Sequence, residues 1–303
     1  MFQVLQVYVE SIVVPAQLAL AMLGMGASLS VQDFLQVARE RRGVLLGLAL
    51  QLLVVPACAV AYANLTGMGK GWATGLLLVA VSPGGAFSNL LTLLGRGNTA
   101  LSVAVTGTTT LACLASVPVL LRVLAGPYLP PDFEMPTGHI VREIGLFLLL
   151  PLLGGMVLLR AFPERAAVFA RWAIRLSTWM VALVVVSSLG SGRIRVGAYG
   201  WVPPVLLSVY GTLVVLVMPL VCRVAGCRDP DSMALTIEVL VRNVGLSLLL
   251  VHFFFPGQPE QGHVLYTVLF YGGMQLVTSI PTVLRHRAGK PILWWLPPRP
   301  AEK

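Results

Sequence analysis

Long apolar stretches separated by short polar breaks dominate this sequence. Hydrophobic residues make up 57% of the 303 residues and charged residues only 11%, against about 25% charged residues in an average soluble domain. A water-soluble fold cannot bury that much apolar surface, whereas a bilayer core about 30 Å thick accepts about 20 apolar residues per helix. We therefore expect an all-α polytopic membrane protein.

The apolar stretches between polar breaks predict nine spans. They lie near 8–30, 43–64, 71–94, 99–125, 141–160, 166–190, 199–222, 232–255 and 263–284. We expect a single transmembrane domain over 1–290 and a short cytoplasmic tail over 291–303. Trp294 and Trp295 favour an interfacial anchor for this tail, and a disordered tail is the alternative.

Basic residues gather in alternate connections. The richer set, with the tail, comprises Arg39, Arg41, Arg42, Arg96, Arg160, Arg165, Arg171, Arg175, Arg223, Arg228, Arg285, Arg287, Lys290, Arg299 and Lys303. The poorer set comprises Lys70, Arg122, Arg142, Arg193 and Arg195. The positive-inside rule places the richer side in the cytoplasm, so we expect a multi-pass protein of the cell membrane with its N-terminus outside. Because the basic residues are scattered among apolar segments, they indicate a lipid bilayer as partner and no nucleic acid.

The third apolar stretch is interrupted by S-P-G-G-A-F-S-N at 82–89. Pro83 lacks a backbone donor and clashes with the preceding turn, and Gly84 and Gly85 lower the cost of non-helical backbone. Backbone groups that are freed at membrane depth must bind protein, water or a ligand. We interpret the segment as a break in the helix, with an ordinary proline kink as the alternative.

The eighth stretch contains T-I-E-V-L-V-R-N-V-G at 236–245, which places Glu238, Arg242 and Asn243 among apolar neighbours. A charge at the middle of the bilayer costs about 2.5 to 3.5 kcal/mol on insertion scales, so such residues normally face a partner or an aqueous cavity. We interpret them as functional. The alternative is a structural ion pair, because Glu238 precedes Arg242 by four residues.

The two interrupted stretches correspond if the chain is an inverted repeat whose first half lacks one span. Paired discontinuous helices in corresponding positions are the best sequence pointer to the binding site of a secondary transporter. Half-helix N-termini attract anions, while freed carbonyls and the Glu238 carboxylate attract cations. The combination indicates a carrier that couples a small organic anion, a carboxylate or sulfonate, to a cation.

Four segments carry a family resemblance: G-M-G-A-S-L at 24–29, S-P-G-G-A-F-S-N at 82–89, G-R-G-N-T-A-L-S-V-A-V-T at 95–106 and A-L-T-I-E-V-L-V-R-N-V-G-L at 234–246. In these segments the chain resembles the bile acid:sodium symporter family in its nine-helix form. The resemblance implies a panel domain and a core domain that move against each other, with the two broken helices crossing in the core. Panel helices are expected near 8–30, 141–160 and 166–190, and core helices near 43–125 and 199–284.

The resemblance also implies that Na⁺ is the coupling ion. One sodium site is expected among the oxygens of Ser88, Asn89, Ser102, Thr106 and Glu238. A hard cation prefers hydroxyl, amide, carbonyl and carboxylate oxygens, and all five residues supply them. For Ser102 and Thr106 taken alone, the alternative is a hydrogen bond back to a carbonyl one turn earlier.

A second sodium site in the family corresponds to Gln51, the backbone around Val239 and Val241, and a glutamine that is replaced here by Arg242. A guanidinium has no acceptor and stays charged, so it cannot ligate sodium. We expect an altered second cation site. Arg242 either substitutes for the second sodium and pairs with Glu238, which leaves one sodium per cycle, or points into the cavity and binds a carboxylate or sulfonate.

Substrate contacts are implied at the backbone amides near Ala86 and Phe87 and at the side chain of Asn243. Where bile-acid-binding members carry more polar groups, the last span offers Tyr271, Gly272, Gly273 and Gln275. We therefore expect a smaller organic anion than a bile acid.

Two other function classes compete with a transporter. For an intramembrane enzyme we find no H-E-x-x-H, no G-x-S-x-G and no pair of intramembrane aspartates, so we expect no enzymatic activity. A transporter fold used as a sensor or regulator without sodium coupling stays open because of the altered cation site. The sequence does not indicate an oligomeric state.

Overall fold

The described part of the chain is built from helices. The computed structural model describes residues 8–32, 41–129, 135–192, 194–254 and 260–293, and this part contains no β-strand. The α-helices are α2 (Val14–Gly26), α4 (Arg41–Ala49), α5 (Val55–Leu65), α6 (Lys70–Val81), α7 (Ala86–Leu94), α8 (Thr99–Leu124), α9 (Thr137–Ile144), α10 (Leu150–Ala161), α11 (Pro163–Gly190), α12 (Val196–Tyr199), α13 (Val202–Val224), α14 (Asp229–Leu240), α15 (Val244–Phe254) and α16 (Gln261–Arg287). Trp294 and Trp295 lie outside the described residues, as do Arg39, Arg193, Arg299 and Lys303.

In the described residues, three π-helical turns lead directly into α2, α5 and α10, and the latter two also continue α4 and α9. They cover Val9–Val13, Leu50–Val54 and Gly145–Leu149, and each ends two residues before a proline. A proline lacks the amide donor and its ring clashes with the carbonyl four residues earlier, so a widened turn relieves the clash without ending the helix. The turn at Leu50–Val54 carries Gln51, which is buried.

The fold is that of an all-α polytopic membrane protein. Within the described residues, six helices are long and apolar enough to cross a bilayer: Arg41–Leu65, Thr99–Leu124, Thr137–Ala161, Pro163–Gly190, Val202–Val224 and Gln261–Arg287. Shorter apolar helices cover Ser11–Gly26 and Lys70–Val81. The number of nine spans stays a prediction.

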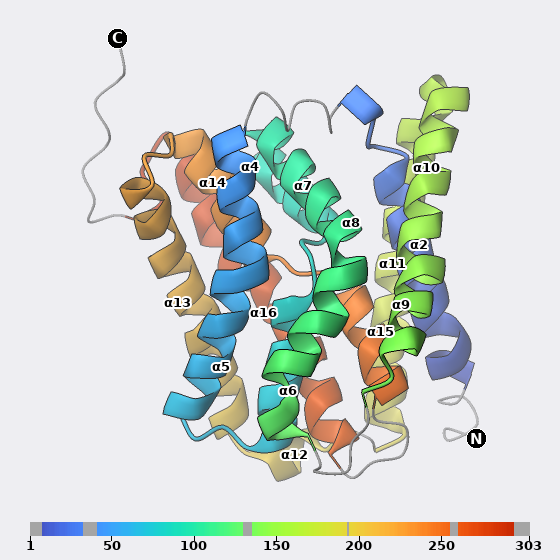
Figure 1. The fold of residues 1–303 in the computed structure, drawn as a ribbon, viewed down its shortest axis with the longest axis vertical. Coiled ribbons are helices and arrows are strands. Elements are labelled where there is room, and N and C mark those ends of the chain that lie inside the picture. Colours follow the sequence, from blue (N-terminus) through green and yellow to red (C-terminus); the bar gives the residue numbers. More distant parts are fainter. Residues whose placement is uncertain (1–7, 33–40, 130–134, 193, 255–259, 294–303) are drawn as a thin grey trace.

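Figure 1 shows α2, α9–α10 and α11 side by side along one edge of the molecule, and we call them the three-helix layer. The other long helices lie beside this layer. Among them are the two interrupted helices, α6–α7 and α14–α15. α15 packs against α2 and connects the layer to the rest. The three helices of this layer cover the ranges expected for the panel. The division into two domains that move against each other stays a prediction.

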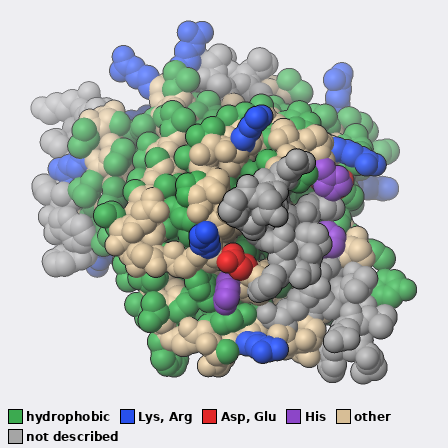
Figure 2. All heavy atoms as spheres, turned by 60° about the horizontal axis from the view of Figure 1, so that its bottom comes forward, with side chains coloured by type: hydrophobic (Ala, Val, Ile, Leu, Met, Phe, Trp, Pro, Cys, Tyr) green, Lys and Arg blue, Asp and Glu red, His purple; other side chains and the backbone are tan. Residues whose placement is uncertain are grey.

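Basic residues concentrate at one end of the molecule. α4 and α8 begin there and α10 ends there (Figure 1), and the basic residues at that end include Arg41, Arg42, Arg96 and Arg160. At the opposite end the described basic residues are Lys70, Arg122, Arg142 and Arg195. Figure 2 brings this opposite end forward, and its described surface is largely hydrophobic with scattered charges.

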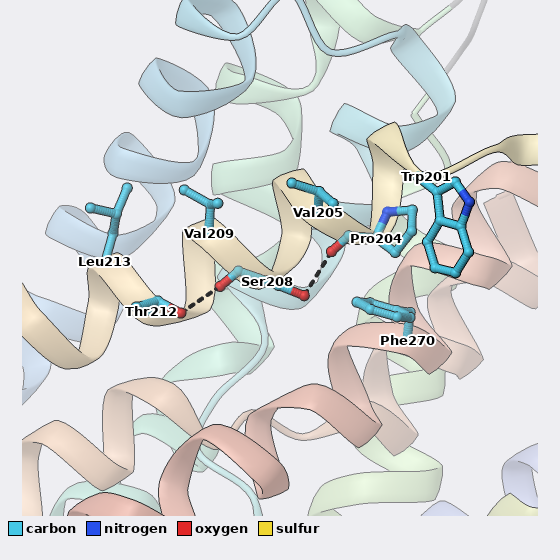
Figure 3. Close-up of a pocket in the computed structure, with 8 residues that line it drawn as sticks. All are labelled: Trp201, Pro204, Val205, Ser208, Val209, Thr212, Leu213 and Phe270. Atoms are coloured by element: carbon cyan, nitrogen blue, oxygen red, sulfur yellow. Dashed lines mark hydrogen bonds between the residues drawn. The ribbon is translucent and has the colours of Figure 1, made fainter.

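The outer face of α13 carries an apolar groove of about 480 Å³ between Trp201 and Leu213 (Figure 3). The hydroxyls of Ser208 and Thr212 donate to carbonyl oxygens one turn earlier, at 2.7 and 2.8 Å. Both hydroxyls are therefore satisfied within their own helix, and the groove suits contact with lipid tails.

Close backbone contact holds α2 against α10. A Cβ added at Gly155 would collide with the carbonyl oxygen of Leu23, and one at Gly26 would collide with the carbonyl of Leu152. Glycines therefore allow the two backbones to approach each other, as at other membrane helix crossings.

We expect Gly155→Ala to lower the free energy of unfolding by about 1 to 3 kcal/mol, because the added methyl pushes α10 away from α2. Gly145→Ala is the matched control, because a Cβ there meets nothing within 4 Å. Thermal unfolding in detergent measures both variants, and equal effects of the two substitutions would contradict the close approach.

Candidate functional site

Two interrupted helices cross at the centre of the molecule. α6 ends at Val81 and α7 begins at Ala86, while α14 ends at Leu240 and α15 begins at Val244. Between these ends the two chains form an isolated antiparallel β-bridge at Gly84 and Arg242. The first segment is therefore a complete break, and the alternative of a proline kink is wrong.

Backbone hydrogen bonds across the crossing replace those that the helices lose. The Gly85 amide donates to the Val241 carbonyl and the Asn243 amide to the Pro83 carbonyl, each at 2.9 Å. Groups that would be unsatisfied at membrane depth thus satisfy one another.

Glycine is required at Gly84 because a Cβ there would collide with the Glu238 carboxylate. At Gly85 a Cβ would lie 3.0 Å from the Arg242 carbonyl oxygen, a tight contact that crowds the bridge. Two glycines therefore let one backbone reach both the other backbone and the acid beneath it.

Each bridge residue is also held by a buried glutamine from another helix. Gln51 Oε1 accepts from the Gly84 amide at 3.1 Å. Gln275 Oε1 accepts from the Arg242 amide at 2.8 Å, and Gln275 Nε2 donates to the Arg242 carbonyl at 3.3 Å. The backbone role of Gln275 was not foreseen from the sequence; the available signal was a carboxamide within an apolar span.

The Glu238 carboxylate is fully buried and accepts hydrogen bonds from four side chains. Ser88 Oγ and Thr106 Oγ1 each donate at 2.6 Å, and Ser102 Oγ and Gln51 Nε2 each donate at 3.1 Å. These donors come from α7, α8 and the π turn before α5, so one acid joins three segments distant in sequence. Such a shell is what keeps a buried carboxylate tolerable.

Asn89 completes the oxygen cluster beside Glu238. Its Oδ1 accepts from Ser102 Oγ at 2.8 Å and from Thr106 Oγ1 at 3.2 Å. The five residues predicted for the first sodium site are thus brought together. Thr106 Oγ1 also lies within donating distance of the Ser102 carbonyl, at 2.9 Å. Its single hydroxyl hydrogen serves one acceptor at a time, so the back-bond is an alternative to the bonds within the cluster. Thr92, whose Oγ1 donates to Ser102 Oγ at 3.3 Å, is an unforeseen member.

The Arg242 guanidinium lies inside the protein, with 2% of the residue exposed. Its Nη1 donates to the Ser82 carbonyl at 3.0 Å, while Nε and Nη2 have no hydrogen-bond partner. Glu238, Tyr210 and Tyr271 are near enough to interact with it electrostatically. The direct ion pair with Glu238 is not formed, because the carboxylate is bonded to hydroxyl and amide groups instead.

The other residues predicted for the second cation site also surround the crossing. Gln51, Val239 and Val241 are all buried. The Val241 carbonyl accepts from Gly85, and Gln51 Oε1 accepts from Gly84. Two of the oxygens expected to ligate a second cation are therefore already engaged by amides of the first break.

A cavity of about 320 Å³ lies between the crossing and the three-helix layer. Ala86, Phe87 and Asn243, the predicted substrate contacts, all line it. Asn243 Oδ1 accepts from the Leu246 amide at 3.1 Å and thereby caps α15. The described lining contains no acidic side chain, and its one charged residue is Arg242. Such a cavity favours an anion over a cation.

Known proteins resemble this chain over most of its length. A family model described as Sodium Bile acid symporter family matches residues 15–195. An uncharacterized sodium-dependent transporter of Bacillus subtilis, YocS, is 30% identical over 78% of this chain and 73% of its own length. The probable sodium/metabolite cotransporter BASS1 of Arabidopsis thaliana chloroplasts is 29% identical over 78% of this chain and 58% of its own length. The mouse sodium-dependent organic anion transporter is 25% identical over 89% of this chain and 72% of its own length.

Replacing Gln275 with Leu is expected to destabilise the crossing. The substitution leaves the buried amide of Arg242 without an acceptor, which costs about 1 to 3 kcal/mol. The Arg242 carbonyl keeps its bond from the Val244 amide. Because the Gln275 side chain bonds to the backbone of Arg242 and not to an ion, the melting temperature is expected to fall equally in sodium and in potassium.

The control is Thr278→Val on the same helix, since the Thr278 hydroxyl donates only within α16. A loss of stability confined to sodium buffers would instead mean that Gln275 contacts the ion.

Proposed function

The chain belongs to the sodium bile acid symporter family, and we propose that it carries a small organic anion together with sodium through the cell membrane by alternating access. The family makes it a transporter and not an enzyme, with sodium as the coupling ion. The observation that carries the proposal is the cluster of five oxygen-bearing side chains that includes the Glu238 carboxylate, directly beneath the crossing.

The oxygen cluster is the proposed binding place of one sodium ion. Ser88, Asn89, Ser102, Thr106 and Glu238 supply hydroxyl, amide and carboxylate oxygens, the donors that suit a hard cation. Hydroxyl hydrogens can turn away from a cation while their oxygens stay in place. An ion there holds α7, α8 and α14 together, and α7 is the helix whose first two residues, Ala86 and Phe87, line the cavity. Sodium binding would thereby set the geometry of the anion site.

Arg242 is the proposed permanent substitute for a second sodium. Its guanidinium lies near Glu238 and cannot lose its charge at physiological pH. The engagement of Gln51 Oε1 and Val241 O by glycine amides supports the same assignment. In this scheme the empty core carries Glu238⁻ and Arg242⁺ and is neutral. Adding one sodium ion and one monoanion keeps it neutral, so transport of a monoanion is expected to move no net charge.

Alternating access requires two parts that move relative to each other. We assign the panel to the three-helix layer and the core to the helices around the crossing, because the cavity lies between them. The arginine-rich end is assigned to the cytoplasm by the positive-inside rule, which places the N-terminus outside and the tail 291–303 inside. A cavity of about 320 Å³ is at the low end for organic ligands and suits an anion smaller than a bile acid.

Sodium is expected to stabilise the purified protein against heat, relative to potassium at equal ionic strength. Glu238→Gln removes the negative charge and should abolish this difference, because binding stabilises only the state that holds the ion. Glu143→Gln is the control, since Glu143 lies on α9 outside the oxygen cluster. An unchanged sodium effect in Glu238→Gln would contradict the proposed site.

Sodium titration of the melting temperature tests the role of Arg242. We expect the wild type to titrate as one site, and Arg242→Gln to gain a second site with a Hill coefficient above one. A wild type that already binds two sodium ions would contradict the substitution. Sodium-gradient-driven anion uptake into vesicles separates a transporter from a transporter-like sensor, which would show none.

A further inference from the structure

Gln17 on α2 is one of three polar residues, with Ser177 and Thr178 of α11, that the three-helix layer contributes to the lining of the cavity. Its residue is 2% exposed and lines the central cavity. Ser177 of α11 donates to the Gln17 carbonyl at 2.9 Å and to Gln17 Oε1 at 3.3 Å, which fixes the carboxamide. Gln17 Nε2 has no hydrogen-bond partner. A buried amide donor without an acceptor is costly unless a ligand supplies one.

The free donor points at the start of α15. A Cβ built on Gly245 would lie 2.6 Å from Gln17 Nε2 and 3.2 Å from Asn243 Oδ1, so the two carboxamides meet over this glycine. Because Asn243 Oδ1 caps α15, its Nδ2 is turned toward α2, where it meets only the Met22 sulfur at 3.7 Å. A thioether is a weak acceptor. Two side-chain donors from opposite sides of the cavity therefore lack an oxygen partner.

Backbone donors add to this site. Ala86 and Phe87 are the first two residues of the nine-residue helix α7 and line the same cavity. First-turn amides have no acceptor within their helix, and the positive end of its dipole lies beside them. The site thus offers N–H groups and no acidic side chain, a combination that binds a carboxylate.

The remaining walls determine the rest of the ligand. They include Ala21, Met22, Ile174, Val181 and Leu269, which are apolar. A cavity of about 320 Å³ is at the low end of the range for organic ligands, which limits the size of the apolar part. The ligand that fits carries one carboxylate and a short apolar body.

We propose that Gln17 is a substrate-specificity residue: its Nε2 binds the carboxylate of a small monocarboxylate that also contacts Asn243 and the start of α7. This deepens the proposed function and rests on it. Because Gln17 belongs to the three-helix layer and Asn243 to the crossing, the bound carboxylate bridges the two parts that must move. Binding of the carboxylate would then also draw the three-helix layer and the crossing together.

The test measures the melting temperature of the purified full chain in sodium, with straight-chain monocarboxylates of four to eight carbons as probes and the corresponding primary amides as neutral controls. At least one carboxylate is expected to stabilise the wild type more than its amide does. In Gln17→Leu the apparent affinity for that carboxylate should fall about ten- to a hundredfold, as expected for a lost hydrogen bond to a charged group. Sodium stabilisation should be unchanged, because Gln17 lies outside the oxygen cluster.

Thr178→Val is the matched control, since Thr178 lines the cavity but donates its hydroxyl to the Ile174 carbonyl of its own helix. Its carboxylate affinity should match the wild type. Gln17→Glu adds a negative charge at the same place and should also abolish carboxylate binding.

The proposal is overturned if no carboxylate of the series stabilises the wild type beyond its amide, or if Gln17→Leu and Thr178→Val behave alike. Equal losses of sodium and carboxylate effects in Gln17→Leu would overturn it as well, by showing a general structural role. Loss of the sodium effect in the wild type would instead count against the proposed function.

Discussion

The antiparallel bridge between Gly84 and Arg242 is the interaction on which the rest of the structure depends. Two helices are broken at membrane depth, where no water is at hand to satisfy a freed amide or carbonyl. The Gly85 and Asn243 amides and the Val241 and Pro83 carbonyls satisfy one another instead. The bridge forms only because glycine lets the first segment pass over the Glu238 carboxylate. The oxygen cluster around Glu238, the Arg242 guanidinium and the central cavity all lie at this crossing.

A single buried acid beneath the crossing explains why polar residues from distant helices converge there. Four side-chain donors surround the Glu238 carboxylate, and two of them, the hydroxyls of Ser102 and Thr106, also contact Asn89 Oδ1. In an apolar interior such a group is stable only with a complete shell of partners. Hydroxyl groups serve the carboxylate and a cation equally well, since each can donate to the first and present its oxygen to the second. The cluster is therefore suited to two states, with and without an ion.

Charge and cavity together describe the proposed transport cycle. Arg242 contributes a fixed positive charge where a mobile one is expected, so the core is neutral both empty and loaded with one sodium ion and one monoanion. The cavity beside it combines N–H donors with apolar walls and excludes acidic side chains among its described lining. Gln17 brings the three-helix layer into the same proposed site, so a bound anion would contact both of the parts that are proposed to move.

The sequence by itself determined the membrane class, because no soluble fold buries 57% hydrophobic residues with so few charges. It also determined where the helices break, because Pro83 with two glycines, and a glutamate with an arginine in an apolar run, contradict an uninterrupted span. The family resemblance supplied the five residues of the oxygen cluster, Glu238 among them, and the structure brings their side chains together. Only the tertiary structure decided the partners of the two charges: Arg242 bonds to Ser82 rather than to the acid four residues away. It also revealed the roles of Gln275 and Gln17, since the spacing of a glutamine along a helix does not say which distant backbone or cavity its carboxamide reaches.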